Sequence, residues 1–228
     1  FSETKQELPG DEMIQAWLNQ QSSELHDQFL NGIESKEEWL EQKPRFKEEY
    51  LYMLGLSPMP KKTPLQPAIT GTLKGEGYEV DMIHYQSSPG LYVTGNLYRP
   101  EHVASGEKLP TILYVCGHAQ RGRDGNKTAY QSHGIWFARH GYICLMIDTL
   151  QRGEIKGVHH GTYSHNRWWW HSRGYTPAGV ECWNGIRGID YLISRSDVDS
   201  ERIGVTGISG GGAVTFWIAG ADERVKVA

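Results

Sequence analysis

The sequence predicts an α/β fold in which a mixed, mostly parallel sheet is preceded by a helical N-terminal extension. Continuous apolar runs of the kind found in strands buried on both faces alternate with helical patterns, which is typical of a parallel sheet. These runs lie at residues 111–116, 142–147 and 203–206. Three shorter strand patterns precede them, at residues 68–74, 78–86 and 91–98. Because short turns join these three, we expect an antiparallel lead-in to the same sheet.

The composition limits the possible functions. A chain of 228 residues suits one large domain with an extension, and its net charge of −4 gives no general attraction to nucleic acid. No apolar run is long enough to predict a membrane span. The odd number of cysteines, which are Cys116, Cys144 and Cys182, argues against a disulfide framework. We expect three buried thiols rather than a cysteine nucleophile.

The N-terminal extension is expected to be helical over residues 11–55, followed by an extended, proline-rich connector. Ser35 and Glu38 form a capping box that predicts a helix start. Pro44 is expected to open a further helix, which Gly55 ends. Packing on the main domain is the favoured role of these helices, and binding of a partner is the alternative. The predicted domains are 1–66, the extension and connector, and 67–228.

Within the second domain, helices are predicted at residues 128–140 and 179–194. A long loop at 149–178 follows the second buried strand. Residues 225–228 resemble the start of a further strand. The Asp124-Gly-Asn126 segment is interpreted as a turn.

A short pattern at the end of the third buried strand carries the chemistry. The strand is followed by Gly207-Ile208-Ser209-Gly210-Gly211 and then by an apolar helical segment. A strand, a Gly-x-Ser-x-Gly turn and a helix form a nucleophile elbow, which holds a serine hydroxyl out from the edge of the sheet. The pattern alone is weak, but the strand and the helix beside it favour Ser209 as a nucleophile.

An acyl-transfer serine needs backbone donors for the developing oxyanion. One is expected to be the N–H of Gly210, the residue after the nucleophile. The second is expected from the loop after the first buried strand, Gly117-His118-Ala119, where the N–H of His118 or Ala119 is the candidate. The His118 side chain could line the acyl pocket or order the loop. A histidine base is expected after the serine in the chain rather than here.

The loop at 149–178 is the candidate substrate wall, because binding sites of such sheets form at the carboxyl ends of strands. Its candidate substrate-binding residues are Arg152, Glu154, Trp168, Trp169 and Arg173. An ordered loop with inward tryptophans and solvated charges is the alternative. The basic residues would also suit a substrate that carries a carboxylate. A zinc site from His159, His160, His165 and His171 matches no strong ligand motif, so no metal is expected.

The elbow resembles that of the α/β-hydrolase superfamily, in the run from Asp199 to Gly212. More narrowly, residues 50–228 resemble the bacterial acetyl xylan esterase-like branch, which is related to dienelactone hydrolase and prolyl oligopeptidase. The other matching pieces are Leu54-Gly-Leu56, Thr63-Pro-Leu65, Gly71-Thr-Leu73, Asn96-Leu-Tyr98 before Pro100, Gly117-His118, Gly141-Tyr142, Asp148, Arg152-Gly-Glu154 and Asp190-Tyr-Leu192.

The resemblance implies a serine carboxylesterase that removes acetyl or methyl groups from polysaccharides and needs no cofactor. It implies Ser209 as nucleophile, and it implies export, although residues 1–7 are polar and do not read as a signal peptide. No histidine follows Ser209. We therefore expect the triad acid and histidine in a further C-terminal segment, outside this chain. The alternatives are a serine peptidase of the prolyl oligopeptidase type and a non-catalytic binding scaffold.

Overall fold

The computed structural model describes residues 9–30, 32–157 and 165–228. The chain divides into two compact units, Phe1–Phe46 and Lys47–Ala228. The second unit begins within a helix, so the end of the predicted extension and the whole connector belong to it. No helix in the described ranges is both long and apolar enough to cross a membrane.

The first unit contains helix α1 (Pro9–Gln28) and the first half of α2 (Lys36–Leu54). The capping box is confirmed, because the Glu38 N–H donates to Ser35 Oγ and the Ser35 N–H donates to Glu38 Oε2. The prediction that Pro44 opens a helix is wrong, since α2 runs through it. Proline removes one helical hydrogen bond, and the turns on both sides keep theirs. α1 contains no residue buried within its own unit.

The second unit is built on a mixed seven-stranded sheet with the order β1-β2-β3-β5-β4-β6-β7. Its first three strands pair antiparallel, as predicted, and β4 to β7 pair parallel to one another. The antiparallel strands are β1 (Ala68–Gly75), β2 (Tyr78–Ser88) and β3 (Leu91–Pro100). The parallel strands are β4 (Leu109–Val115), β5 (Ile143–Ile147), β6 (Val198–Gly207) and β7 (Val225–Val227).

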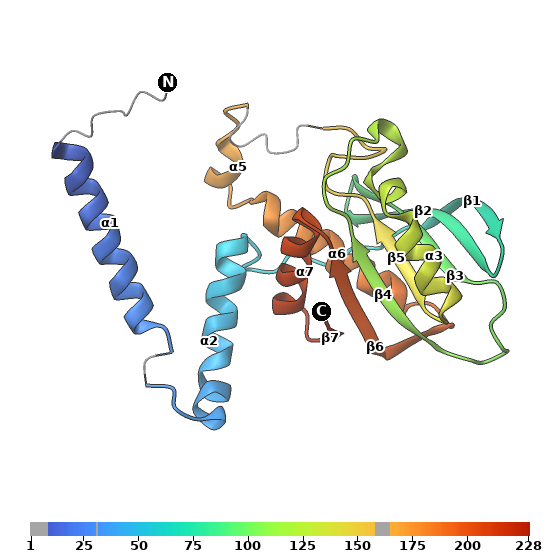
Figure 1. Ribbon diagram of the computed structural model, residues 1–228, viewed down its shortest axis with the longest axis horizontal. Helices are drawn as coiled ribbons and strands as arrows, with labels where there is room; N and C mark the ends of the chain where they lie inside the picture. The colour runs from blue at the N-terminus through green and yellow to red at the C-terminus, as the bar shows by residue number, and fades with distance from the viewer. Residues whose placement is uncertain (1–8, 31, 158–164) are drawn as a thin grey trace, which may run out of the picture. The chain divides into compact units, whose positions relative to one another are not determined.

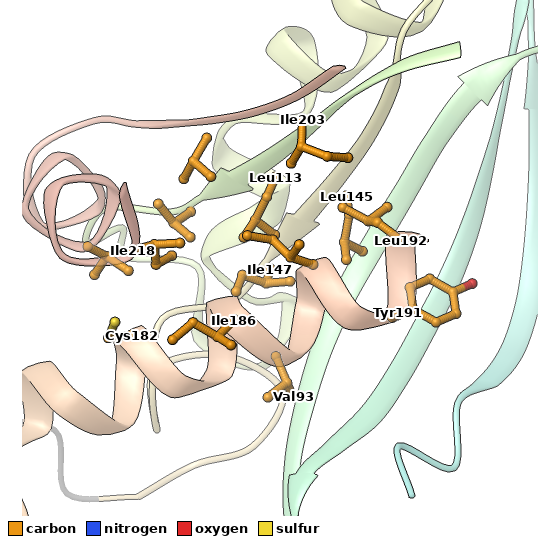
Figure 2. Close-up of a cluster of buried hydrophobic side chains, with 14 of the residues drawn as sticks. Val93, Leu113, Leu145, Ile147, Cys182, Ile186, Tyr191, Leu192, Ile203 and Ile218 are labelled. Carbon is orange, nitrogen blue, oxygen red and sulfur yellow. The ribbon is translucent and has the colours of Figure 1, made fainter. Parts of the chain in front are cut away.

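Helices cover both faces of the sheet (Figure 1). α3 (Gln131–Arg139) packs on β3 and β5, while α6 (Pro177–Ile193) and α7 (Gly210–Ala221) pack on the other face. Successive strand residues point to opposite faces, so Leu113 belongs to one hydrophobic cluster and its neighbour Tyr114 to the other. Figure 2 shows Leu113, Leu145 and Ile203 on the side of α6, where Ile186 and Leu192 meet them.

Three short elements lie in regions that the sequence left less defined. The predicted 149–178 loop contains α5 (Trp169–Ser172). α3 is preceded by two 3₁₀ turns, η1 (Gly122–Asp124) and η2 (Asn126–Ala129).

α6 begins at Pro177, two residues earlier than expected, because Thr176 caps it by accepting the Gly179 N–H at 2.9 Å.

All three cysteines are free and buried, as predicted. Burial raises the pKa of the Cys116 and Cys144 thiols far above the ordinary value, and it raises that of Cys182 to about 12. A thiol acts as a nucleophile through its thiolate. These three side chains are therefore packing residues.

Candidate active site

Ser209 lies in the sharp turn that joins β6 to α7 and is the N-cap residue of that helix. Its backbone has φ 57° and ψ −122°, a conformation that a side-chain-bearing residue seldom adopts. The side chain is exposed. The turn is closed by the Gly211 N–H donating to Ile208 O at 2.9 Å and the Gly212 N–H donating to Ser209 O at 2.8 Å. The strained geometry expected of a nucleophile elbow is therefore present at Ser209.

Both glycines of the Gly-x-Ser-x-Gly pattern, Gly207 and Gly211, are required because they pack closely against β4. A Cβ at Gly207 would lie 2.3 Å from the carbonyl oxygen of Val115, at the end of β4, and a Cβ at Gly211 would lie 2.1 Å from the same oxygen. Both contacts are far inside van der Waals distance and involve backbone. Ser209 projects outward between them only because both neighbours lack a side chain.

We expect Gly211→Ala to lower the free energy of unfolding by about 1–3 kcal/mol, because the new methyl group overlaps the Val115 carbonyl. Gly212→Ala is the matched control. A Cβ there meets no atom closer than 3.9 Å, so stability should stay equal or rise by up to about 1 kcal/mol. Urea unfolding of both variants measures the difference. Equal stability of the two variants would contradict the packing argument.

The loop after β4 reaches the elbow directly. A Cβ at Gly117 would lie 2.3 Å from Ile208 O and 3.2 Å from Ser209 Cβ, so only glycine allows this approach. The imidazole of His118 lies beside Gly210, with its Cε1 3.6 Å from the position of a Cβ there. The structure thus brings together Ser209, Gly210 and the Gly117-His118 segment, as the sequence predicted.

The two amide candidates for the second oxyanion donor differ in their surroundings. The Ala119 N–H donates to Asn126 Oδ1 at 3.2 Å, so this donor is already used within the loop. The His118 carbonyl accepts a hydrogen bond from Tyr130 Oη at 3.4 Å. Of the two predicted donors, the His118 N–H is the better candidate.

A buried ion cluster lies next to this loop. Lys127, only 2% exposed, donates from Nζ to Asp148 Oδ2 at 2.6 Å and to Glu154 Oε1 at 2.5 Å. Asp148 follows β5, and it also accepts from the Lys127 N–H at 3.0 Å and from Thr94 Oγ1 at 2.8 Å. The cluster ties the loop after β4 to the loop after β5.

The five predicted substrate-binding residues fall into two groups. Arg152 and Glu154 lie in the first part of the loop, where Glu154 is bound to Lys127 and the Arg152 Nε is buried with no hydrogen-bond partner. Trp168, Trp169 and Arg173 lie at α5, and both tryptophans are 55% exposed. Inward packing of the tryptophans, the alternative for this loop, is not found at Trp168 and Trp169. Two of the four histidines considered as zinc ligands, His159 and His160, lie outside the described residues.

Glu181 on α6 is a buried carboxyl that the sequence did not point out. It lines a small cavity together with Val115, Asp148, Asn184 and Val214. Burial raises its pKa to about 7, although its Oε1 accepts a hydrogen bond from the Leu150 N–H at 3.3 Å.

This carboxyl predicts a pH-dependent stability. Between its ordinary pKa of 4.5 and about 7, the folded protein holds a proton that the unfolded chain has lost, so the free energy of unfolding falls as pH rises. Glu181→Gln removes this dependence. Relative to wild type, the variant should gain on the order of 3 kcal/mol of stability from pH 4.5 to pH 8 in denaturant titrations. Parallel pH profiles for the two proteins would show that Glu181 does not titrate as described.

Asn126, Lys127 and Thr149 are functional candidates that sequence reasoning missed. The sequence predicts only a turn at Asn126. In the structure this residue is buried, with 2% of its surface exposed. The usable signal was the Asp148-Thr149 pair, two polar residues directly after a buried strand. Such residues lie at the edge of the sheet where sites form.

Comparison with known proteins identifies the family and the fold of the chain. The acetyl xylan esterase (AXE1) family matches residues 55–228, which is most of the chain. The methylesterase BT1017 is 28% identical, with a TM-score of 0.67, over 86% of this chain and 42% of that one. An acetyl xylan esterase from Paenibacillus sp. R4 shares the fold at 21% identity and a TM-score of 0.57, over 81% of this chain and 57% of that one.

A curated relative of another class also matches. Dipeptidyl peptidase 8 of Homo sapiens is 28% identical over 143 residues, which is 60% of this chain and 14% of that protein. The chain thus spans about half the length of the solved structures named above, and a smaller share of this relative. The matched structures are esterases with an α/β-hydrolase fold. The chain belongs to the acetyl xylan esterase (AXE1) family, a family of hydrolases that act on ester bonds.

Proposed function

We propose that the protein containing this chain is a serine carboxylesterase that removes acetyl or methyl groups from carbohydrates, with Ser209 as its nucleophile. The observation that carries the proposal is the backbone of Ser209. It has a positive φ at a helix N-cap, between two glycines that both pack on β4. A fold maintains such strain where it presents a reactive group.

In the proposed reaction, the Ser209 hydroxyl attacks the ester carbonyl carbon while a base takes its proton. The N–H groups of Gly210 and His118 stabilise the oxyanion, and the N-terminus of α7 adds a favourable field. The C–O bond to the alcohol breaks, and the alcohol leaves with the proton. Water then hydrolyses the acyl-enzyme and regenerates the hydroxyl.

The carbohydrate part of the proposal is supported by the family match and by the exposed aromatic rings at α5. Trp168 and Trp169 are each 55% exposed, and Tyr175 is 58% exposed, which suits contact with sugar rings. Arg152 and Glu154 stand at the other end of the same loop as proposed contacts for polar groups, and Arg173 lies beside the tryptophans. We propose a small ester or a polysaccharide as substrate, with no nucleic-acid partner, and export as the location.

The test uses the natural full-length protein, since the chain spans about half the length of the solved structures that it matches. It is assayed on p-nitrophenyl acetate, acetylated xylan, methyl-esterified pectin and a peptide p-nitroanilide. We expect ester hydrolysis with release of acetate or methanol, and the released product identifies the acyl or alkyl group. Cleavage of only the anilide would favour the peptidase alternative suggested by dipeptidyl peptidase 8. No turnover of any ester would contradict the proposal.

A further inference from the structure

A chain of three hydrogen bonds runs behind the proposed oxyanion hole, through two buried side chains. Asn126 is 2% exposed and Thr149 is 9% exposed. Asn126 accepts from the Ala119 N–H at 3.2 Å and donates from Nδ2 to Thr149 Oγ1 at 3.0 Å. Thr149 Oγ1 then donates to the Cys116 carbonyl oxygen at 2.8 Å. The three bonds connect η2, the loop after β5 and both ends of the segment 116–119.

We propose that Asn126 and Thr149 are positioning residues of the oxyanion hole, which fix the direction of the His118 N–H. This inference rests on the proposed function. The peptide planes before and after the His118 amide are held, one through the Cys116 carbonyl and one through the Ala119 N–H. A planar peptide between two fixed neighbours has little freedom to rotate. Thr149 Oγ1 also donates to the Gly117 carbonyl oxygen at 3.4 Å, which belongs to the same peptide as the His118 N–H. The His118 N–H therefore keeps one direction.

The direction of the His118 N–H matters because the segment 116–119 contacts the elbow. Gly117 lies against Ile208 O and Ser209 Cβ, so a rotation of the adjacent peptide changes the donor next to the serine. Removing one oxyanion donor costs about 10²- to 10³-fold in kcat. A displacement of about 1 Å in a catalytic group costs up to about 10²-fold. A misdirected His118 N–H is thus expected to lower kcat by about 10- to 100-fold.

The hydrogen bonds also have an ordinary structural role, so the test needs a matched control. Thr149→Val removes the hydroxyl at the elbow end of β4 with little change in shape. Thr111→Val makes the same change at the opposite end of that strand, where the fully buried Thr111 Oγ1 donates to Leu109 O at 3.2 Å. Thr111→Val loses this one buried hydrogen bond, whereas Thr149→Val loses the donations to the Cys116 and Gly117 carbonyls and the acceptor of Asn126 Nδ2. Only the first changes the segment 116–119.

The experiment measures kcat and KM on p-nitrophenyl acetate, and thermal unfolding, in the natural full-length protein. We expect Thr149→Val and Asn126→Ala each to lower kcat about 10- to 100-fold, with KM changed less than about 3-fold. Thr111→Val should keep wild-type kcat although it too loses a buried hydrogen bond. Because the bonds act in series, the double variant should be no worse than about 3-fold below the poorer single variant. Thr149→Ser, which restores the hydroxyl, should return kcat to within about 3-fold of wild type.

The inference fails if Thr149→Val and Asn126→Ala keep the kcat of Thr111→Val, or if Thr149→Ser is as slow as Thr149→Val. If Thr149→Val does not fold, Asn126→Ala and Thr149→Ser decide by the same criteria. Wild-type turnover that depends on Ser209, together with these negative results, would overturn only the positioning role. A wild type without such turnover would overturn the proposed function and this inference with it.

Discussion

Replacing Ser209 by alanine is expected to lower the esterase kcat of the full-length protein by about 10⁵- to 10⁶-fold. The loss is large because the hydroxyl is the group that forms the acyl-enzyme, and residual activity comes only from binding and the oxyanion donors. Steady-state hydrolysis of p-nitrophenyl acetate measures it. A fluorophosphonate probe, which reacts with activated serines, should label the wild type and not the variant.

The control for this prediction is Ser200→Ala. Ser200 is an exposed serine on β6, the strand that leads into the elbow, and lies at the strand's other end. Its substitution should leave kcat within about 2-fold of wild type, as exposed sites far from such features usually tolerate change. A Ser209→Ala protein that keeps more than a tenth of the wild-type kcat would show that another residue performs the attack.

Lys127→Met is expected to cost about 3–5 kcal/mol of stability, the range found when one partner of a buried ion pair is removed. The variant leaves the Asp148 carboxylate buried with the Lys127 N–H and Thr94 Oγ1 as its remaining donors. Glu154, which is half exposed, regains water and adds little to the loss. Equilibrium unfolding in guanidinium chloride measures the difference.

Lys226→Met is the matched control, because Lys226 pairs with Glu201 at 3.7 Å on the surface. Exposed pairs of this kind contribute below about 1 kcal/mol. If both substitutions cost the same, the Lys127 cluster would not be the buried pair described. The loss should also shrink when Asp148 is replaced by asparagine in the Lys127→Met background, since the buried charge is then gone.

The elbow was predictable because every requirement for it is local. The β-branched run before Gly207, the two glycines and the apolar helix after Ser209 all lie within one short stretch of chain. The mixed, mostly parallel sheet was predictable from the alternation of apolar runs and helices after an antiparallel lead-in. The same reasoning located Gly117, since the loop after the first buried strand must approach the elbow for an oxyanion hole to form.

The network behind the oxyanion loop was not predictable in this way. Lysine is seldom buried, so Lys127 gave no sign of its position within the core. Its partner Asp148 is 21 residues away, and the two meet only because β5 pairs with β4 and brings the loops after these strands together. Asparagine is a common turn residue, and the two side-chain hydrogen bonds of Asn126 depend on the same sheet order.

In the helical extension, the sequence predicted local structure but not tertiary contacts. Periodic apolar residues correctly predicted helices, but α1 has no buried residue, so periodicity gave no information about what the apolar stripe contacts. Pro44 was read as a helix start by local rules alone. The structure keeps it inside α2, where Leu54 at the far end is buried and packs with Leu56 in the main core.

Mass spectrometry of the fluorophosphonate adduct is the measurement that tests the central claim most directly. The full-length protein is labelled, digested and sequenced, and the modified residue is identified. We predict a single adduct on Ser209, lost when the protein is unfolded before labelling, because the strained elbow and the aligned donors exist only in the fold. An adduct on a different residue, or an ester-hydrolysing protein that carries no adduct on Ser209, would contradict the account.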